Sequence, residues 1–520
     1  MIDFKRLLKG VALGVATGLV LSSSCFAAPK VGNSACNFGN ANWKQPEAKY
    51  VFMFIGDGMA GPQIHAAEAY LADKMQADET PGGVKAKLLA FDRFPVVGLS
   101  TTYANDRFIT GSAASGTSLA CGMKTNIGVI SMNPGVDKPY KTLAEAASEK
   151  GMKVGIVSSV SIDHATPAVF YAHQPSRGNY HEIAMELANS GFDYFAGGGF
   201  KRNETGIDSD GNPIEGAIPT AIANGFKYVT DRTGLNECLP GNRVLATTEI
   251  VGGSALPYAI DRLDADGDYT ANISLAEFTA KGIELLDNDK GFFMMVESGK
   301  IDWACHANDA RAAIDDTLAF NDAIWEAINF YLMNPEETLI IVTGDHECGG
   351  MTLGFAGTSY GTSFGDLAGQ KNSYEMFNKY FFADYKETAT WKNAYFNINQ
   401  TLKDAFLEYF NLEWTELTDY EKAQLEDAYD RSMGKVAVVS SQEDKELYGG
   451  YEAMTVTLTH ILNNRSGIAF NSYSHTGVPV PVFAMGFGQN IFGGFYDNTD
   501  IALKVAALME VEIGDVETKD

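Results

Sequence analysis

The chain has 520 residues, enough for one large α/β domain with insertions or for about three smaller domains. Its hydrophobic content of 45% and charged content of 20% are ordinary for a globular protein. Acidic residues outnumber basic ones by 66 to 39, and the formal net charge of −27 argues against nucleic acid and anionic membrane surfaces as partners.

The first 27 residues have the pattern of an export signal. Basic Lys5 and Lys9 precede an uncharged apolar run from Val11 to Leu21, and residues 25–27 resemble a cleavage site. The apolar run is too short to favour a membrane-spanning helix. We therefore expect a signal peptide over residues 1–27 and a periplasmic or extracellular protein without a membrane span. Lipid attachment at Cys25 is the alternative.

Short apolar runs that end in polar loops recur along the chain, and helical stretches alternate with them. The predicted strands span residues 50–55, 152–158, 291–296, 338–342 and 479–485. The predicted helices span residues 65–75, 140–150, 180–189 and 275–286. This alternation predicts an α/β fold with a doubly wound, mostly parallel sheet and helices on both faces. Ligands of such sheets bind beyond the carboxyl ends of the strands.

Two stretches interrupt the alternation. Residues 200–262 are rich in Gly, Asn and Pro and are interpreted as loops with short elements. Residues 355–470 are rich in aromatic residues and predict helices over 401–410, 419–432 and 451–463. Because a strand follows this second stretch, we interpret it as an insertion into a single catalytic domain that spans residues 28–520.

Carboxylate, hydroxyl and imidazole side chains gather where the predicted strands end. Carboxylates with imidazoles suit zinc, and carboxylates with a hydroxyl suit magnesium. Each residue alone is more often a surface or hydrogen-bonding group, but an ensemble at the strand ends argues for a metal site. The candidates are Asp57, Thr166, Glu297, Asp302, His306, Asp345, His346 and His475.

The acidic stretch 264–268 resembles a calcium loop. No register places both a Gly at the sixth position and a Glu at the twelfth, as such loops require. We interpret the stretch as a solvated acidic loop.

Small residues surround Ser112 in the segment 109–120. A helix that begins at Ser112 would direct its free N–H groups toward a bound anion. The same pattern also suits a serine that only caps a packing helix, and the segment alone does not decide between the two. A serine hydroxyl is a weak nucleophile near neutral pH unless a neighbouring group or a metal activates it.

Six segments resemble the alkaline phosphatase family, and their order and spacing match that family over most of residues 48–490. The resemblance implies a metal-dependent hydrolase of phosphate monoesters with two zinc ions and one magnesium ion. Ser112 would attack phosphorus, and water would hydrolyse the resulting phosphoserine. The segments are FIGDGMAGPQ, TGSAASGTSLACGMKTN, DHATPAVFYAHQPSR, FFMMVESGKIDWACHANDA, VTGDHECGG and YSHTGVPV.

The resemblance also implies a role for each polar residue. Arg177 matches the arginine that binds two phosphate oxygens, a task for which the planar guanidinium is suited. The implied ligand sets are Asp302, His306 and His475 for one zinc; Asp57, Asp345, His346 and Ser112 for the second zinc; and Asp57, Thr166 and Glu297 for magnesium.

Three positions near these residues vary or depart from the family pattern. His164 is expected beside the magnesium-type site, where manganese or cobalt are alternatives, and Trp303 is expected to form a wall of the phosphate pocket. Gly111 stands where many members have an aspartate that holds the arginine. We therefore expect a more mobile Arg177 and weaker binding of the phosphate product.

The cysteine pattern does not indicate disulfide bonds. Five would remain after removal of the signal peptide, with no CxxC motif, so no disulfide framework is inferred. Cys305 and Cys348 lie close to candidate ligand histidines, and we interpret them as small buried hydrophobic residues rather than metal ligands.

Two other functions share parts of this pattern. A phosphodiesterase or phosphomutase would use the same two-zinc core, but Arg177 favours monoesters because it needs two unsubstituted oxygens. A non-catalytic phosphate-binding protein would not need Ser112 together with a full ligand set. Small phosphate monoesters are thus the expected substrates. The resemblance is compatible with a homodimer, and the natural ester is not indicated.

Overall fold

The computed structural model describes residues 47–76, 87–202, 206–207, 213–248, 254–262, 272–388, 398–434 and 441–516. The predicted export signal, Cys25 and the acidic stretch 264–268 lie outside these residues. Within the described ranges, every helix is too short or too polar to cross a lipid bilayer.

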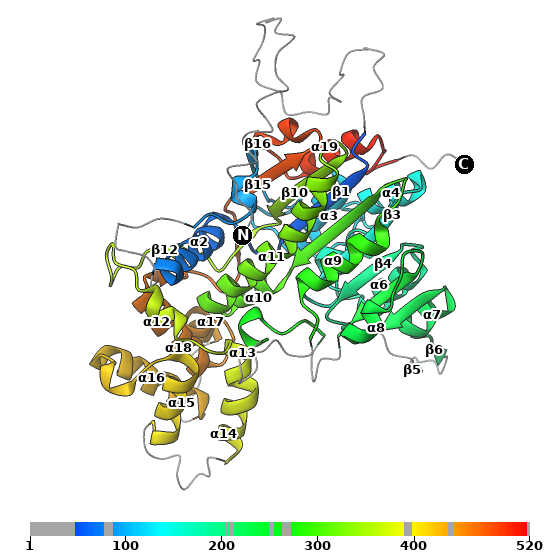
Figure 1. Ribbon diagram of the computed structural model, residues 1–520. Coiled ribbons are helices and arrows are strands. Elements are labelled where there is room, and N and C mark those ends of the chain that lie inside the picture. Colours follow the sequence, from blue (N-terminus) through cyan, green and yellow to red (C-terminus); the bar gives the residue numbers. More distant parts are fainter. Residues whose placement is uncertain are drawn as a thin grey trace, which may run out of the picture. The chain divides into compact units, whose positions relative to one another are not determined.

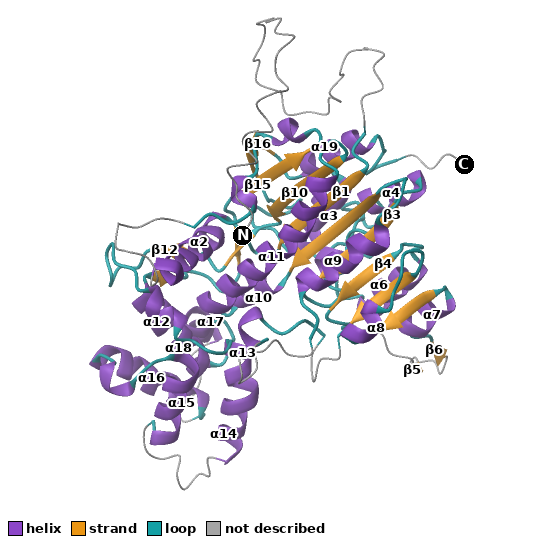
Figure 2. Cartoon of the chain, viewed as in Figure 1, coloured by secondary structure: helices purple, strands orange, loops and turns teal. Residues whose placement is uncertain are grey.

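A ten-stranded sheet with the order β16-β2-β15-β10-β1-β9-β3-β4-β8-β7 forms the centre of the fold (Figures 1 and 2). All neighbouring pairs are parallel except those that β15 makes with β10 and β2. The prediction of a mostly parallel sheet is therefore confirmed. The strands are β1 (Tyr50–Gly56), β2 (Val96–Ser100), β3 (Lys153–Ser158), β4 (Tyr194–Gly197), β7 (Phe226–Val229), β8 (Arg243–Thr247), β9 (Phe292–Ser298), β10 (Thr338–Gly344), β15 (Val480–Gly486) and β16 (Gly494–Tyr496).

Strand β1 shows why the sequence forms this sheet. All seven of its residues are buried, as expected for a central parallel strand that is covered on both faces. Successive side chains point to opposite faces, so Phe52 and Phe54 enter one hydrophobic core while Val51 and Met53 enter another. The two cores lie on the two sides of the sheet, which is the arrangement of a doubly wound fold.

Helices supply the outer wall of both cores, as Figure 2 shows in purple. Those of the Phe52 core include α2 (Gly61–Gln76), α9 (Leu275–Leu286), α10 (Lys300–His306) and α11 (Ala310–Met333). Those of the Val51 core include α3 (Ser112–Cys121), α4 (Leu143–Lys150), α5 (Ala165–Ala168), α6 (Tyr180–Asn189), α7 (Ala217–Ala223) and α19 (Thr499–Met509). Capping boxes begin α4 at Thr142 and α9 at Ser274, where side chain and backbone satisfy each other's free groups.

The stretch 200–262 contributes more to the sheet than expected. Its short elements include β7 and β8, which pair with each other and extend the main sheet beyond β4. These strands have four and five residues, so their apolar alternation is too brief to distinguish them from loops in the sequence. The remaining short elements here are β5 (Gly206–Ile207), β6 (Pro213–Ile214), α8 (Arg232–Asn236) and η3 (Ala259–Asp261).

The stretch 355–470 is mostly helical, and several hydrogen bonds join it to the loop between α10 and α11. Gln370 Nε2 donates to the Asp309 carboxylate at 3.0 and 3.1 Å, and His460 Nε2 lies 2.9 Å from Asn308 Oδ1. The division into a signal peptide and one domain with an insertion stays a prediction. Its elements are α12 (Phe364–Ala368), α13 (Tyr374–Met376), η4 (Phe377–Phe382), α14 (Ala383–Thr388), α15 (Gln400–Phe410), η5 (Trp414–Glu416), α16 (Asp419–Ser432), α17 (Ser441–Tyr448), α18 (Ala453–Ser466) and β13 (Ile468–Ala469).

Five further short elements flank the sheet. Strand β13 pairs with β12 (Thr352–Leu353). Strand β11 (Glu347–Cys348) pairs antiparallel with β14 (His475–Thr476), and this pair lies just beyond the end of β10. Two 3₁₀ turns complete the chain, η2 (Phe91–Arg93) and η6 (Gln489–Phe492).

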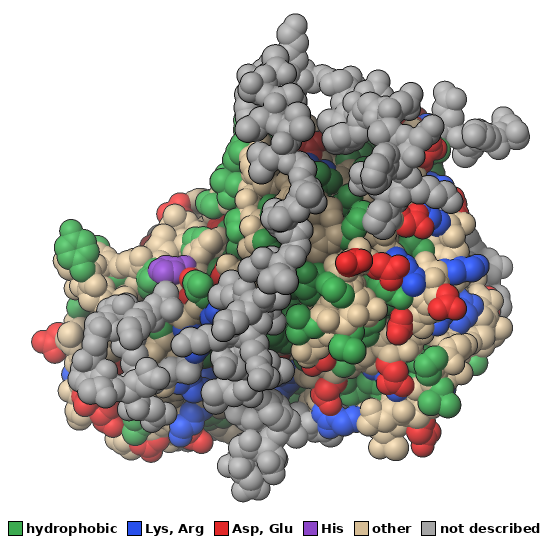
Figure 3. Space-filling model, turned by 45° about the horizontal axis from the view of Figure 1, so that its top comes forward, with side chains coloured by type: hydrophobic (Ala, Val, Ile, Leu, Met, Phe, Trp, Pro, Cys, Tyr) green, Lys and Arg blue, Asp and Glu red, His purple; other side chains and the backbone are tan. Residues whose placement is uncertain are grey.

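The surface carries both acidic and basic side chains. Acidic and basic side chains are interspersed on the described part of the face in Figure 3. With a formal net charge of −27, the chain as a whole does not attract an anion. A phosphate site must therefore supply its positive charge locally.

Candidate active site

The carboxyl ends of three adjacent strands bring acidic residues together. Gly56 at the end of β1 lies opposite Gly344 of β10 and Ser298 of β9. Asp57 and Asp345 follow directly after their strands, and Glu297 is the next-to-last residue of β9. All three side chains are buried. Parallel register therefore brings residues that are far apart in the sequence to one edge of the sheet, as predicted.

Helix α3 places Ser112 at this edge. Gly111 precedes the helix in an ordinary extended conformation, and Ser112 is its first residue. The buried Ser112 Oγ lies 3.3 Å from His346 Nε2. One turn later, Ser115 Oγ donates to the Asp345 backbone carbonyl at 2.6 Å and ties the helix to the end of β10. The serine hydroxyl thus lies where the free N–H groups and positive dipole of a helix favour an anion.

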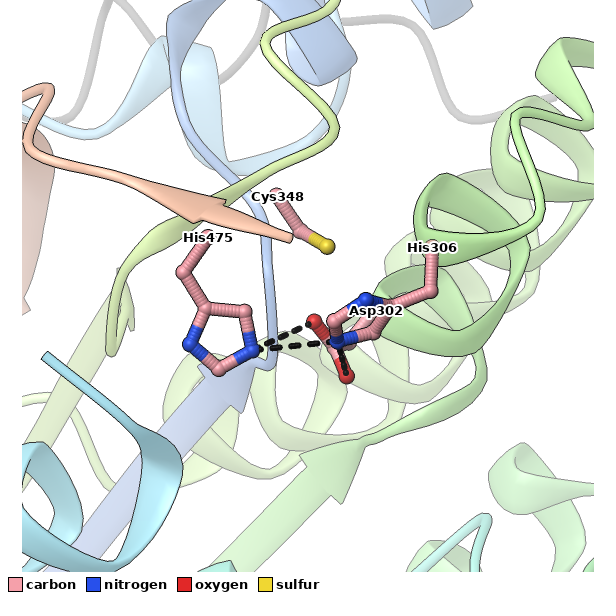
Figure 4. A group of neighbouring side chains, drawn as sticks. All are labelled: Asp302, His306, Cys348 and His475. Atoms are coloured by element: carbon pink, nitrogen blue, oxygen red, sulfur yellow. Dashed lines mark hydrogen bonds and ion pairs between the residues drawn. The ribbon is translucent and has the colours of Figure 1, made fainter. Parts of the chain in front are cut away.

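A first group of candidate metal ligands contains Asp302, His306 and His475 (Figure 4), and it is called the first site below. Helix α10 presents Asp302 and His306 one turn apart, with His306 Nε2 at 3.3 Å from Asp302 Oδ2. His475 Nε2 lies 3.4 Å from Asp302 Oδ1 and 3.1 Å from His306 Nε2. The sulfur of Cys348 belongs to the same group.

Backbone carbonyls orient both histidines of the first site. His306 Nδ1 lies 2.7 Å from the Tyr473 carbonyl oxygen, and His475 Nδ1 lies 2.8 Å from the Thr110 carbonyl oxygen. A carbonyl only accepts, so each Nδ1 donates, and Nε2 is the nitrogen that each ring directs toward the group. Histidines that bind metals are commonly held in this way.

A second group, the second site, lies next to Ser112. His346 Nε2 is 3.1 Å from Asp345 Oδ2 and 3.4 Å from Asp57 Oδ1, and all three side chains are buried. Because Ser112 Oγ approaches the same histidine nitrogen, the serine hydroxyl faces this cluster directly.

A third group, the third site, shares Asp57 with the second and adds Glu297 and His164. Thr166 Oγ1 donates to Asp57 Oδ2 at 3.2 Å, so the predicted hydroxyl lies beside these carboxylates. Ser158 Oγ donates to Glu297 Oε2 from the neighbouring strand, a contact that the sequence did not indicate. Carboxylates with a hydroxyl are the oxygen ligands that magnesium prefers.

Several polar atoms in the three sites are buried and have no hydrogen-bond partner. Leaving such a group unsatisfied costs roughly 1–3 kcal/mol, and more when it is charged. Native structures rarely accept that cost for several neighbouring carboxylates without an ion. The residues present therefore fit divalent cations. The atoms are Asp57 Oδ1, Glu297 Oε1, Asp302 Oδ1, Asp345 Oδ2, His164 Nδ1 and His346 Nδ1.

The pKa shifts of the buried carboxyl groups also indicate that these sites fit cations. Burial, followed by repulsion from the nearby carboxylates, raises the pKa of Asp57 and of Asp345 well above the ordinary range. Burial raises the pKa of Glu297 to about 7. Burial also opposes ionisation of Asp302, but the neighbouring histidines, led by His306, outweigh it and lower the pKa of that carboxyl. Bound cations would favour the charged form of every one of these groups.

Arg177 has a partner that the sequence did not predict. Its Nη2 donates to His164 Nε2 at 3.0 Å. Burial, followed by the positive charge of Arg177, lowers the pKa of His164 well below its ordinary value, so the imidazole is neutral and accepts. Trp303 packs edge-to-face on the same imidazole, with ring centroids 5.7 Å apart, and Lys201 Nζ lies 5.3 Å from the centroid of the indole. Arg177 and His164 lie in loop segments without regular periodicity, which carry no sequence signal for this contact.

The structure also separates the two cysteines that the sequence treated alike. Cys348 joins the first site, whereas Cys305 Sγ contacts Gln63 Nε2 at 3.8 Å and belongs to none of the three groups. The four cysteines in the described ranges are free thiols, all of them buried. The proximity of Cys348 to His475 depends on the pairing of β11 with β14, which no sequence pattern predicts for strands of two residues.

Comparisons with known proteins agree with this arrangement. A family model described as alkaline phosphatase matches residues 48–511. Alkaline phosphatase 4 of Bacillus subtilis is 31% identical over 510 residues, covering 95% of this chain and 96% of that protein. Alkaline phosphatase 3 of the same organism is 32% identical over 513 residues, covering 95% of this chain and 96% of that protein.

Solved structures extend the likeness to three dimensions. The cold-active alkaline phosphatase of a psychrophilic Shewanella species superposes with a TM-score of 0.70 at 27% identity, covering 88% of this chain and 99% of that chain. The alkaline phosphatase of Thermus thermophilus superposes with a TM-score of 0.70 at 25% identity, covering 90% of this chain and 94% of that chain. The chain therefore belongs to the alkaline phosphatase family of hydrolases.

Proposed function

We propose that this enzyme hydrolyses small phosphate monoesters through a covalent phosphoserine at Ser112. The observation that carries the proposal is the position of Ser112 Oγ, at the buried N-terminus of α3 and 3.3 Å from His346 Nε2. A serine that served only as a helix cap would not need a cluster of unsatisfied carboxylates and imidazoles around it.

The family depends on metal ions, and the three sites assign ligands for them. The nitrogen and carboxylate donors of the first two sites suit zinc, and the oxygen donors of the third suit magnesium, with manganese or cobalt as alternatives. When bound, such ions supply Lewis acidity, which lowers the pKa of coordinated hydroxyl groups and offsets the charge of a phosphoryl group. The proposed ligands are Asp302, His306 and His475; Asp57, Asp345, His346 and Ser112; and Asp57, Thr166 and Glu297.

The chain's own residues account for the two chemical steps. Ser112 Oγ gives its proton to solvent and forms a bond to phosphorus, while the ester oxygen departs and takes up a proton from solvent. Water then attacks the phosphoserine, the phosphorus–Ser112 bond breaks, one proton of the water is lost to solvent as Ser112 Oγ regains one, and inorganic phosphate leaves. The N-terminus of α3 and the Arg177 guanidinium stabilise the negative charge of the phosphoryl oxygens in both steps.

Arg177 favours monoesters over diesters. Its planar guanidinium can donate to two phosphoryl oxygens at once. A monoester then keeps a third unesterified oxygen for the other positive groups of the site, whereas a diester has only two unesterified oxygens in all. With His164 bound to one N–H of Nη2, the remaining donors stay free for phosphate. We expect p-nitrophenyl phosphate to be hydrolysed far faster than bis(p-nitrophenyl) phosphate; a preference for the diester would replace the proposal with a phosphodiesterase.

The decisive experiment is Ser112→Ala with metal analysis of the purified protein. Removal of the nucleophile should lower kcat about a thousandfold or more, while about two zinc ions per chain remain because the other ligands are intact. Ser118→Ala is the matched control, since Ser118 is also buried in α3 but bonds within the helix to the Ala114 carbonyl at 3.2 Å. Activity that survives Ser112→Ala would refute the assigned role.

The location of the protein belongs to the same proposal. Residues 1–27 would act as an export signal that leaves residues 28–520 as the mature enzyme, and the stretch 355–470 would be an insertion. Comparing the N-terminal residue of the secreted protein with position 28 tests this directly. A lipid on Cys25 would show as a mass increase and a membrane-bound product.

A further inference from the structure

The pairing of β11 with β14 gives Cys348 a direction toward the first site. Cys348 lies opposite His475, and Glu347 lies opposite Thr476. Adjacent residues of a strand point to opposite faces, so the first two share one face and the other two share the other face. On that other face, Glu347 Oε1 accepts from Gln63 Nε2 at 2.7 Å, and Glu347 Oε2 accepts from Thr476 Oγ1.

The sulfur of Cys348 completes a four-membered group. The ligand atoms of Asp302, His306, His475 and Cys348 all lie within 4.8 Å of one another, and Figure 4 shows the sulfur directed toward the other side chains. His306 Nε2 lies 3.1 Å from His475 Nε2 and 3.3 Å from Asp302 Oδ2, and His475 Nε2 lies 3.4 Å from the other carboxylate oxygen, Asp302 Oδ1. A tetrahedral zinc site with bonds of about 2.0–2.1 Å requires edges of about 3.3 Å between such atoms.

Two further observations point to an ion at the centre of this group. Asp302 is buried to all but 6% of its side chain, and its Oδ1 accepts no hydrogen bond. The Nε2 atoms of His306 and His475 face each other at 3.1 Å while their Nδ1 atoms are committed to backbone carbonyls. Two lone pairs at that distance repel unless a proton or a cation lies between them.

We propose that Cys348 is a fourth protein ligand of the first site, so that the metal there is held by Asp302, His306, His475 and a cysteine thiolate. The inference rests on the metal site of the proposed function. On binding, the thiol proton is released to solvent and the sulfur coordinates directly. A substrate oxygen at this ion then requires five-coordination, which zinc permits.

The thiolate has consequences for metal preference. Sulfur is a soft donor and favours zinc or cobalt over magnesium or manganese at the first site. The second and third sites contain no cysteine among the described residues, so the sulfur signal of a loaded enzyme is specific to the first site.

Cobalt substitution tests the proposal without reference to activity. The metal-free enzyme is loaded with Co²⁺ and its absorption is recorded in the near ultraviolet, where thiolate-to-cobalt charge transfer absorbs strongly and carboxylate or imidazole ligation does not. The wild type should show this band, and Cys348→Ser should lose it. Cys305→Ser is the matched control: that thiol is also buried and adjoins His306, yet lies outside the group, so the band should remain.

X-ray absorption at the zinc edge of the wild-type holoenzyme gives a second readout that needs no variant to fold. We expect a sulfur neighbour at about 2.3 Å in addition to nitrogen and oxygen. A spectrum with nitrogen and oxygen alone, or a cobalt band that survives Cys348→Ser, would overturn the proposal. An active enzyme without the sulfur signal refutes only the role of Cys348, whereas an inactive enzyme with the signal refutes only the phosphatase mechanism.

Discussion

At the scale of single residues, Arg177 has a neutral partner. The position before the proposed nucleophile has no carboxylate, and the guanidinium donates to the neutral imidazole of His164 at 3.0 Å; the greater mobility of Arg177 stays a prediction. A neutral acceptor orients the arginine without neutralising it. The full positive charge therefore remains available to a phosphoryl group, which suits a chain whose net charge is −27.

The His164 contact predicts a measurable effect on product binding. His164→Ala should raise the inhibition constant for inorganic phosphate about tenfold, because a hydrogen bond to a charged group is worth about 1.5–3 kcal/mol. His164→Gln, which places an acceptor oxygen where Nε2 lies, should recover much of the loss. Metal content is measured in parallel, since His164 also adjoins the third site. Equal inhibition constants for all three proteins would show that the contact does not position Arg177.

Gly111→Asp tests the consequence of the missing carboxylate. A Cβ at this position would meet only Ile127 Cδ1 at 3.8 Å, and the backbone conformation is ordinary, so the substitution should not disturb folding. A second partner for Arg177 should lower the inhibition constant for phosphate by about two- to fivefold, the yield of a partly exposed ion pair. Gly111→Asn adds the same bulk without charge and should leave the constant unchanged. The hypothesis fails if the aspartate and asparagine variants behave alike.

At the scale of elements, the register of the parallel strands brings together acidic residues from separate segments of the chain. The seven residues of β1 pair in register with β9 and β10, and this places Asp57, Glu297 and Asp345 at one level. Helix α3 is then tied to the end of β10 by the Ser115 hydroxyl, so the proposed nucleophile Ser112 is held by the sheet rather than by a loop. Rigid elements of this kind preserve catalytic distances.

Contacts between elements also make stability depend on pH. Burial, and next the charge of Glu68 on α2, raises the pKa of Asp92 in η2 to about 7. The ordinary value is about 3.9. A raised carboxyl pKa contributes stability below the unfolded value and loses it as the pH rises through the folded value, here from about 4 to about 7. At alkaline pH the folded protein therefore carries an unfavourable, partly buried charge at Asp92.

Asp92→Asn should relieve that cost. The amide oxygen can still accept from the Leu89 N–H, which now donates to Asp92 Oδ2 at 2.8 Å, and the amide N–H can donate toward Glu68. We expect the variant to melt about 1–3 °C above the wild type at pH 8.5, with the difference shrinking toward pH 5. Asp73→Asn makes the same change in net charge at an exposed position of α2. A gain in melting temperature that does not change with pH, or that Asp73→Asn shows as well, would contradict the raised pKa of Asp92.

At the scale of the whole molecule, the three sites join segments from residue 57 to residue 475 around one buried cluster of carboxylates. Without cations that cluster opposes folding, because burial and mutual repulsion raise the pKa of Asp57 and of Asp345. Ions that bind only the folded chain stabilise it by mass action, by about 2.7 kcal/mol each at one hundred times the dissociation constant.

Removal of the metals should therefore lower the melting temperature by about 10 °C or more, and zinc with magnesium should restore it. The measurement is a thermal melt after chelation and dialysis, with metal content determined for each sample. Treatment with metal-saturated chelator is the control for the reagent itself. An unchanged melting temperature in protein shown to be metal-free would mean that the sites are not loaded in the native enzyme.

Sequence by itself was sufficient for the fold class and for naming most of the residues that the fold brings together at the carboxyl edge of the sheet. Strands such as β1 and β10 are continuous apolar runs, and α9 carries both its amphipathic period and its capping box within twelve residues. Apolar runs, amphipathic periods and capping boxes each lie within one segment, so they can be recognised without knowing which distant segments pack together. The motifs around Asp57, Ser112 and His346 likewise lie in contiguous segments and were sufficient to recognise the family.

Tertiary structure alone decided which residues touch. The short strands β7 and β8, the contact between Arg177 and His164, and the place of Cys348 beside His475 depend on packing between segments without a periodic pattern. Cys305 and Cys348 have similar sequence surroundings, yet only Cys348 belongs to one of the three groups of candidate metal ligands. Residues alternate between faces in β11, so Cys348 points to the face of His475 and Glu347 to the opposite face. Direction and register are properties of the folded sheet, and they determine the chemistry available to each side chain.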